Sequence, residues 1–137
     1  MGLILDSSIL IAGERSGRTG IEILNRVKVS HGETESGVSV VTIVELPHGI
    51  YRAKSVADRE RRQTFSEELC RDLMVYPVTL EIAQIAGKIE GEQGARGVSI
   101  AFEDLLIGAT TLHLGFAVAT LNVAHFQLIP DLSVVRI

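Results

Sequence analysis

The chain has 137 residues, 46% of them hydrophobic, which is enough for one compact domain with a sizeable core. Its formal charge of −4 excludes a general attraction to nucleic acid, so such a partner would have to be held by a local basic patch or by metal ions. The single cysteine, Cys70, excludes an internal disulfide, and its place beside Leu69 on a helix face predicts a buried, inert thiol.

The N-terminal segment predicts a strand that stops at an aspartate. Residues 2–5 are nearly all apolar, as in a strand covered on both faces, and Asp6 separates them from a short helix expected over residues 7–12. This segment lacks a basic leader, so we expect no secretory signal and a cytoplasmic protein. The apolar stretch 105–121 is interrupted by threonines, a histidine and glycines, so we expect no membrane span.

Helical and strand patterns then alternate along the chain. Thr79 is the expected N-cap of one helix, and the helix over residues 54–72 carries so few apolar residues that it should project partly into solvent. The expected helices cover residues 21–29, 42–53, 54–72, 80–94 and 101–114, with a polar loop over 31–37. The expected strands cover residues 38–41, 74–78, 116–120 and, at one edge, 134–137.

This alternation predicts the fold class. Strands that alternate with helices favour right-handed parallel crossovers, which place helices on both faces of the sheet. We therefore predict an α/β fold, a three-layer α/β/α sandwich with a central, mainly parallel sheet. No internal repeat divides the sequence, so residues 1–137 should form a single domain.

Four polar residues stand where apolar runs stop, namely Asp6, Glu45, Asp104 and Asn122. Such positions converge at one edge of a parallel sheet, so we expect them to form one acidic pocket. Gathering three carboxylates makes it costly to ionise all of them, and a divalent cation that prefers oxygen ligands relieves this cost. Mg²⁺ or Mn²⁺ is the expected ion. Because such an ion activates water and stabilises a leaving oxygen, phosphodiester hydrolysis is the corresponding reaction.

Each of these residues also has a purely structural explanation. Asp6 and Asn122 can cap helices, and Asp104 suits the positive end of a helix dipole. Thr42 and Glu45 match the spacing of a capping box. If these explanations hold, the acidic residues serve the fold alone.

Two other groups of residues have side chains that could serve a function. The only dense basic stretch is either a solvated helical face or a contact for RNA phosphates, and it contains Arg52, Lys54, Arg59, Arg61 and Arg62. The four histidines lack the spacing of a zinc site; they are His31, His48, His113 and His125.

Four segments carry a resemblance that covers almost the whole chain: Leu5–Ile11, Ser39–Gly49, Phe102–Ala109 and Ala119–Phe126. In this order and spacing they resemble the PIN-domain ribonuclease family, in particular the VapC-like toxins of bacterial and archaeal toxin-antitoxin pairs. The resemblance implies a PIN-like fold and a metal-dependent endoribonuclease that hydrolyses RNA. It also implies a cognate antitoxin protein as partner, whose C-terminal segment places a basic side chain near the acidic pocket.

The resemblance also implies a role for each residue of the acidic set. Asp6, Glu45 and Asp104 correspond to the principal catalytic and metal-binding carboxylates, with Mg²⁺ or Mn²⁺ as cofactor, and Asn122 corresponds to a more variable fourth catalytic position. The chain departs from the family pattern at His125, where many relatives carry an acid. A homodimer is implied as well, and the sparsely apolar charged helix, which a single core supports poorly, favours the same expectation.

Two readings of other classes stay open. A phosphotransfer domain would use Asp6 as the phosphorylated aspartate, but Ser8 occupies the position where a common form of that site carries a second acid. A non-catalytic α/β interaction module would use the acids only to cap helices. Metal binding that disappears when Asp6 and Asp104 are changed would exclude the interaction module.

Overall fold

Five parallel strands form the centre of the fold in the order β3-β2-β1-β4-β5. They are β1 (Leu3–Leu5), β2 (Ser36–Ser39), β3 (Met74–Tyr76), β4 (Ala117–Thr120) and β5 (Ser133–Arg136). The computed structural model describes residues 2–32 and 34–137, so position 33 of the expected polar loop and position 1 of the expected domain lie outside the described residues. The predicted parallel sheet is confirmed, and β5 is the edge strand expected at the C-terminus.

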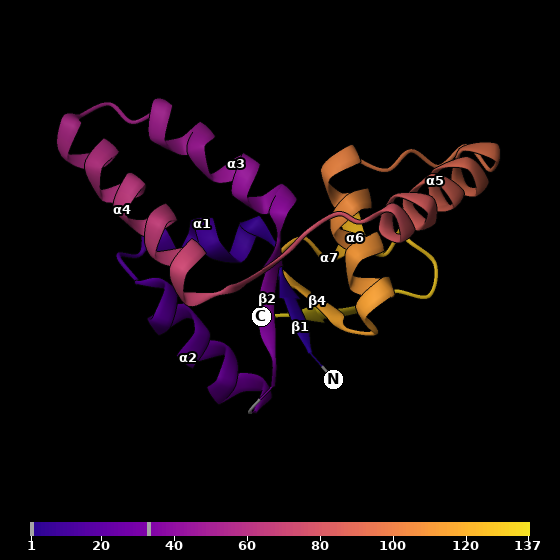
Figure 1. The fold of residues 1–137 in the computed structure, drawn as a ribbon, viewed down its shortest axis with the longest axis horizontal. Helices are drawn as coiled ribbons and strands as arrows, with labels where there is room; N and C mark the ends of the chain where they lie inside the picture. Colours follow the sequence, from indigo (N-terminus) through magenta and orange to yellow (C-terminus); the bar gives the residue numbers. More distant parts are fainter. Residues whose placement is uncertain (1, 33) are drawn as a thin grey trace.

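Helices cover both faces of this sheet and complete the three predicted layers (Figure 1). α1, α2 and α4 lie on one side, and α5, α6 and α7 lie on the other. The helices are α1 (Ser7–Arg15), α2 (Gly20–His31), α3 (Val40–Tyr51), α4 (Val56–Asp72), α5 (Leu80–Ala95), α6 (Phe102–Leu114) and α7 (Val123–Phe126). Within the described part of the chain, no helix is both long and apolar enough to cross a membrane.

Alternation along the central strands divides the core in two. Leu3 and Leu5 pack with α1, α2 and α4, whereas Ile4 between them packs with α5 and α6. Neighbouring β4 repeats the pattern, since Val118 faces the second group. Both faces of β1 are therefore buried, which explains why its sequence is a continuous apolar run.

Helix boundaries differ from the predicted ones where a local hydrogen bond decides them. The predicted strand 38–41 is wrong at its end, because the Ser39 hydroxyl accepts a hydrogen bond from the Val41 N–H at 3.1 Å and starts α3 at Val40. Thr79 caps α5 as predicted, with its hydroxyl accepting from the Ile82 N–H at 3.3 Å.

The thiol of Cys70 is exposed, so the predicted buried thiol is wrong. Its neighbour Leu69 fills the core side of α4. The next residue on a helix is rotated by about 100°, which carries Cys70 to the solvent side.

Helix α4 is held by a few apolar residues and by one partly exposed ionic cluster around the buried Glu14. Phe65 and Leu69 are its buried residues. The carboxylate of Glu14 in α1 is only 8% exposed and lies 2.8 Å from Arg61 Nη1 and 3.9 Å from Arg62 Nε. Arg62 also donates to the carbonyl of Gly49 in α3. Two arginines of the basic stretch therefore join α4 to α1 and α3, which favours the structural reading for this part of the stretch.

Candidate active site

The predicted site residues come together at the carboxyl ends of the three central strands. Asp6 follows β1 directly, Glu45 lies in α3 after β2, and Asn122 follows β4 after one residue. Asp104 comes from the first turn of α6. Because β1 lies between β2 and β4, its aspartate occupies the middle of this edge of the sheet.

Asp6 is fixed by hydroxyl groups. It is 3% exposed, and its Oδ2 accepts hydrogen bonds from Ser8 Oγ at 2.8 Å and from Thr120 Oγ1 at 2.9 Å. The Ser8 hydroxyl also accepts from the Leu121 N–H, and the Thr120 hydroxyl accepts from the Asn122 N–H. These bonds tie the carboxylate after β1 to the backbone after β4 and set its orientation.

The hydrogen bond of Ser8 to Asp6 was not predicted from the sequence. Ser8 stands in the sequence Asp6-Ser7-Ser8, where either hydroxyl can reach back to the aspartate. Only the structure distinguishes them, since Ser8 Oγ lies 2.8 Å from the carboxylate of Asp6, and Ser7 Oγ lies 3.5 Å from it. Ser7 instead lies between two acids, with its Oγ 3.4 Å from Glu45 Oε2.

Glu45 has an oxygen without a partner. Its Oε1 is buried and accepts no hydrogen bond from the described residues. Burial raises the pKa of Glu45 to about 7, and the nearby charge of Asp6 adds to this rise. The hydroxyl of Ser7 acts to lower this pKa, while Glu103 and Asp104 raise it further. The site therefore disfavours the ionised carboxylate as long as no cation balances it.

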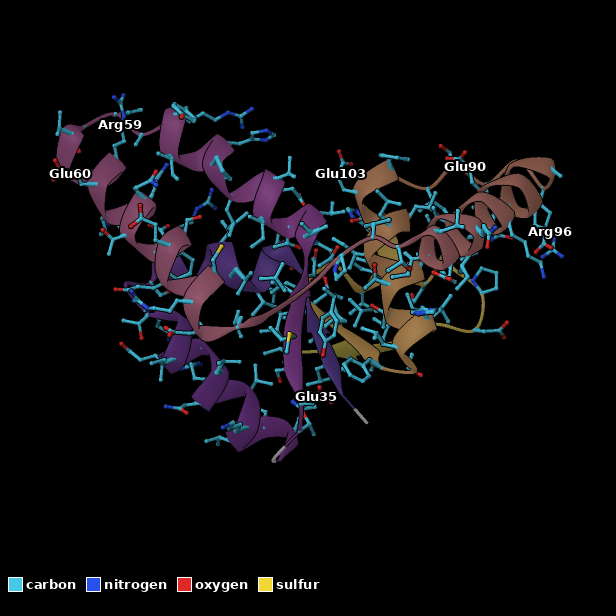
Figure 2. The ribbon with its side chains drawn as sticks, in the orientation of Figure 1. Glu35, Arg59, Glu60, Glu90, Arg96 and Glu103 are labelled. Atoms are coloured by element: carbon cyan, nitrogen blue, oxygen red, sulfur yellow. The ribbon has the colours of Figure 1, made fainter. Side chains whose placement is uncertain are left out.

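The pKa of Asp104 is also shifted by burial and by neighbouring charges. Burial raises the pKa of Asp104, and so does the charge of Asp6, while His125 acts in the opposite direction. His125 Nδ1 lies 3.5 Å from Asp104 Oδ2. The preceding residue, Glu103, is exposed, and Figure 2 shows it at the outer end of α6, directed away from the sheet.

Asn122 lies at the edge of the site and is exposed. It occupies the N-cap position of α7, a single-turn helix too short to be recognised from periodicity, but its side chain forms no capping hydrogen bond. Its side chain is free to turn toward a ligand of the site.

The capping explanations fit the structure poorly. Asp6 stands at the N-cap position of α1, but its side chain makes no capping hydrogen bond. The proposed capping box of Thr42 and Glu45 is wrong, because α3 begins at Val40 and both residues lie inside the helix. Asp104 is in the first turn of α6, where the helix dipole favours it. Two of the three acids thus lack the structural role offered for them.

The donor set fits a hard divalent cation in its chemistry. After burial, the charge of Asp6 is the next cause that raises the pKa of both Glu45 and Asp104, and the buried Glu45 Oε1 has no hydrogen-bond donor among the described residues, a place that a cation would fill. Among the described residues, no three side chains of His, Cys, Asp or Glu form a group ready to hold a metal ion. The three carboxylates would therefore have to move closer together to bind one ion.

The raised pKa of Glu45 predicts a pH-dependent stability in the presence of a chelator. A carboxyl group whose folded pKa is above its unfolded value stabilises the protein below about pH 4.5, and this contribution is lost as the pH rises through about 7. Glu45→Gln should therefore be as stable as the wild type at pH 4.5 and more stable than the wild type at pH 7.5. Because this group is half-buried and partly screened by solvent, we expect the free energy of unfolding of Glu45→Gln at pH 7.5 to exceed that of the wild type by about 1–2 kcal/mol.

Urea denaturation of both proteins at the two pH values measures this difference. Glu90→Gln, at an exposed position of α5, is the matched control and should behave like the wild type at both. Equal stabilities of the wild type and Glu45→Gln at pH 7.5 would contradict the prediction.

This geometry defines a class of protein: an α/β domain with a carboxylate site at the C-terminal edge of a parallel sheet. The PIN domain family matches residues 3–129. A protein named ribonuclease VapC from Rickettsia bellii is 31% identical over 137 residues, covering 100% of this chain and 97% of that protein. Ribonuclease VapC1 from Rickettsia felis is 28% identical over the same length. The chain belongs to the PIN-domain family, and its curated relatives carry the name VapC.

Solved structures support the same fold. VapBC2 from Rickettsia felis, bound to a DNA fragment from its promoter, has a TM-score of 0.84 at 19% identity, with 100% of this chain and 99% of that chain covered. VapBC-1 from nontypeable Haemophilus influenzae has a TM-score of 0.80 at 25% identity, with 99% of this chain and 98% of that chain covered.

Proposed function

We propose that the protein is a metal-dependent endoribonuclease and the toxin of a toxin-antitoxin pair. The observation that carries this proposal is the group of carboxylates Asp6, Glu45 and Asp104 at the carboxyl edge of the sheet. Burial and the charge of Asp6 raise the pKa of the other two, and one buried oxygen of Glu45 has no partner among the described residues. The names of the relatives, ribonuclease VapC, support RNA as the substrate. An RNA substrate also supports a cytoplasmic location.

Asp6, Glu45 and Asp104 would hold Mg²⁺ or Mn²⁺. When bound, such an ion supplies an activated water and stabilises charge on the phosphate and the leaving oxygen. Ser8 and Thr120 hold the Asp6 carboxylate through their hydroxyl groups. Asn122, exposed beside them, offers an amide that can orient a water or a phosphate oxygen.

The test is cleavage of defined RNAs by the purified protein. Cleavage within the RNA is expected with Mn²⁺ or Mg²⁺ and should fall to background when EDTA is added, then return with excess Mn²⁺. Cleavage that continues in EDTA would remove the metal from the proposal. A phosphorylated protein with no RNA cleavage would favour the phosphotransfer reading, and neither activity would favour the interaction module.

An antitoxin partner is supported by the VapBC complexes among the structural neighbours. A cleft between α1, α3 and α4 offers a place for part of such a partner. Ile11, Leu46 and Phe65 supply its apolar surface, and Arg15 and Arg52 supply positive charge beside the Glu14–Arg62 pair. A partner segment with apolar and acidic side chains fits this lining.

A homodimer is also part of the proposal. Val44 of α3 and Phe102 of α6 are 65% and 64% exposed, and these two helices pack against each other beside the acidic residues. Pairing through this surface would bury two large apolar side chains and bring two acidic sites together. Sedimentation at about 20 μM, a concentration that separates stable from weak dimers, should give twice the mass of 14.8 kDa for the wild type and the monomer mass for Phe102→Glu. A wild-type monomer would reject the dimer.

A further inference from the structure

An open hollow lies between the last turn of α3 and the first half of α4. Its volume is about 520 Å³, within the range of about 300–1,000 Å³ that small-molecule pockets have. Figure 1 shows that α3 and α4 are joined far from the sheet, at the outer end of the molecule. The residues that line the hollow are Ile50, Tyr51, Arg59, Glu60, Gln63 and Thr64.

The hollow combines a buried apolar side chain with an exposed aromatic ring. Ile50 is 5% exposed, whereas the neighbouring Tyr51 is 80% exposed. Among the described residues, none forms a hydrogen bond with the Tyr51 hydroxyl, so the ring is not held by a polar partner. An exposed ring of this kind offers a flat face on which an unpaired RNA base can stack.

Two charged side chains of α4 stand beside this ring. In the described part of the chain, neither Arg59 nor Glu60 has an ion pair or a side-chain hydrogen bond, whereas Arg61 and Arg62 both lie close to Glu14. Figure 2 shows Arg59 and Glu60 at the outer end of α4. The fold therefore uses two arginines of the basic stretch and leaves Arg59 available for a ligand.

These charges match the two parts of a nucleotide. A guanidinium such as that of Arg59 pairs with a phosphate. The carboxylate of Glu60 repels a phosphate, but it accepts a hydrogen bond from the amino group that cytosine carries on C4. Uracil carries a carbonyl oxygen at that position, which a carboxylate repels. The hollow is therefore suited to a pyrimidine with an amino group.

We propose that this hollow binds an unpaired base of the RNA substrate, with Tyr51 stacking on the base, Arg59 pairing with a phosphate and Glu60 favouring cytosine over uracil. The inference rests on the proposed function and assigns a sequence preference to it. Glu45 of the acidic site belongs to the same helix as Tyr51, six residues and therefore about 9 Å away along the axis. A short stretch of one strand thus connects the hollow with the acidic site.

Fluorescence anisotropy of labelled oligocytidine and oligouridine tests the hollow on the full chain in EDTA, apart from metal-dependent cleavage. The wild type should bind oligocytidine about fivefold more tightly than oligouridine. Tyr51→Ala should weaken the binding of both strands about tenfold, and Tyr51→Phe should bind like the wild type because it keeps a stacking ring. Leu80→Ala removes a side chain of α5 that is 70% exposed and is the matched control without effect.

The two charges are tested by different quantities. Arg59→Ala should weaken both strands equally and reduce the dependence of log K on log salt by about 0.7, the value for one phosphate contact. Glu60→Ala should lower the ratio of the two affinities to about one. Arg96→Ala and Glu90→Ala change exposed residues on the opposite side of the molecule (Figure 2) and should alter neither quantity. Melting curves check that every variant is folded.

The outcomes separate this inference from the proposed function. A wild type that cleaves RNA, with a Tyr51→Ala variant that binds both strands equally well, would overturn the hollow and leave the nuclease intact. Weaker binding of the antitoxin alone by Tyr51→Ala would likewise overturn it, in favour of a protein partner. Binding by Tyr51→Phe as weak as that of Tyr51→Ala would overturn the stacking.

The preference and the nuclease have their own contrary results. Equal affinity of the wild type for oligocytidine and oligouridine would overturn the role of Glu60. A wild type that prefers oligocytidine but cleaves no RNA would support the hollow and overturn the nuclease. Failure of the wild type to bind either strand would overturn both.

Discussion

Asp104→Asn is expected to lower the rate of RNA cleavage at least about 1,000-fold, and Asp6→Asn should do the same. Each change replaces a charged oxygen ligand by a neutral amide of nearly the same shape, which weakens metal binding and leaves the developing charge on the phosphate uncompensated. A 1,000-fold loss corresponds to about 4 kcal/mol of transition-state stabilisation. Initial rates on a defined RNA at saturating Mn²⁺ give this ratio.

Stability measurements distinguish a lost ligand from a lost fold. The pKa of Asp104 is raised by burial and by Asp6, so neutralising it removes repulsion and should leave the melting temperature in EDTA unchanged or higher.

Asn122→Ala is the matched variant at the edge of the site and should reduce cleavage only about tenfold, because a neutral amide is a weaker ligand than a carboxylate. Full activity of both aspartate variants would reject the site, and a larger loss at Asn122 than at Asp6 would reverse the ranking.

The arrangement of the sheet was predictable because its cause lies in the sequence pattern. Residues 3–5 are apolar at successive positions, as expected of a strand buried on both faces, and Asp6 ends that run at the carboxyl end of the strand. Parallel strands share one carboxyl edge, so the pattern was enough to expect Asp6 near the residues that follow β2 and β4.

Other features depend on contacts between distant segments and left little trace in the sequence. The Glu14 cluster joins α1 to arginines 47 and 48 positions later, so Arg61 and Arg62 were indistinguishable from an RNA-binding stretch. Cys70 was misplaced because one residue step decides which side of α4 faces the core. The approach of His125 to Asp104 depends on a single-turn helix with no periodic signal.

An arginine of the cognate antitoxin is expected to inhibit the enzyme by pairing with the same carboxylates that bind the metal. Burial and the charge of Asp6 raise the pKa of both Glu45 and Asp104, so a guanidinium inserted among the three carboxylates is stabilised by several charges and competes with the cation. Replacing that arginine by glutamine should weaken inhibition of RNA cleavage about 30-fold or more, which corresponds to the loss of a charged pair of about 2 kcal/mol.

Growth of a bacterial host provides the matching test in cells. Expression of the wild-type chain alone should slow growth, co-expression of its antitoxin should restore growth, and Asp6→Asn should leave growth unaffected at the same protein level. The Asp6 variant is the sharp control because Asp6 is only 3% exposed, so its replacement removes a buried charge and hardly alters the surface that partners contact. If the wild type and Asp6→Asn slow growth equally, cleavage at this site is not the cause of toxicity. The inhibitory arginine would then have to act elsewhere than on these carboxylates.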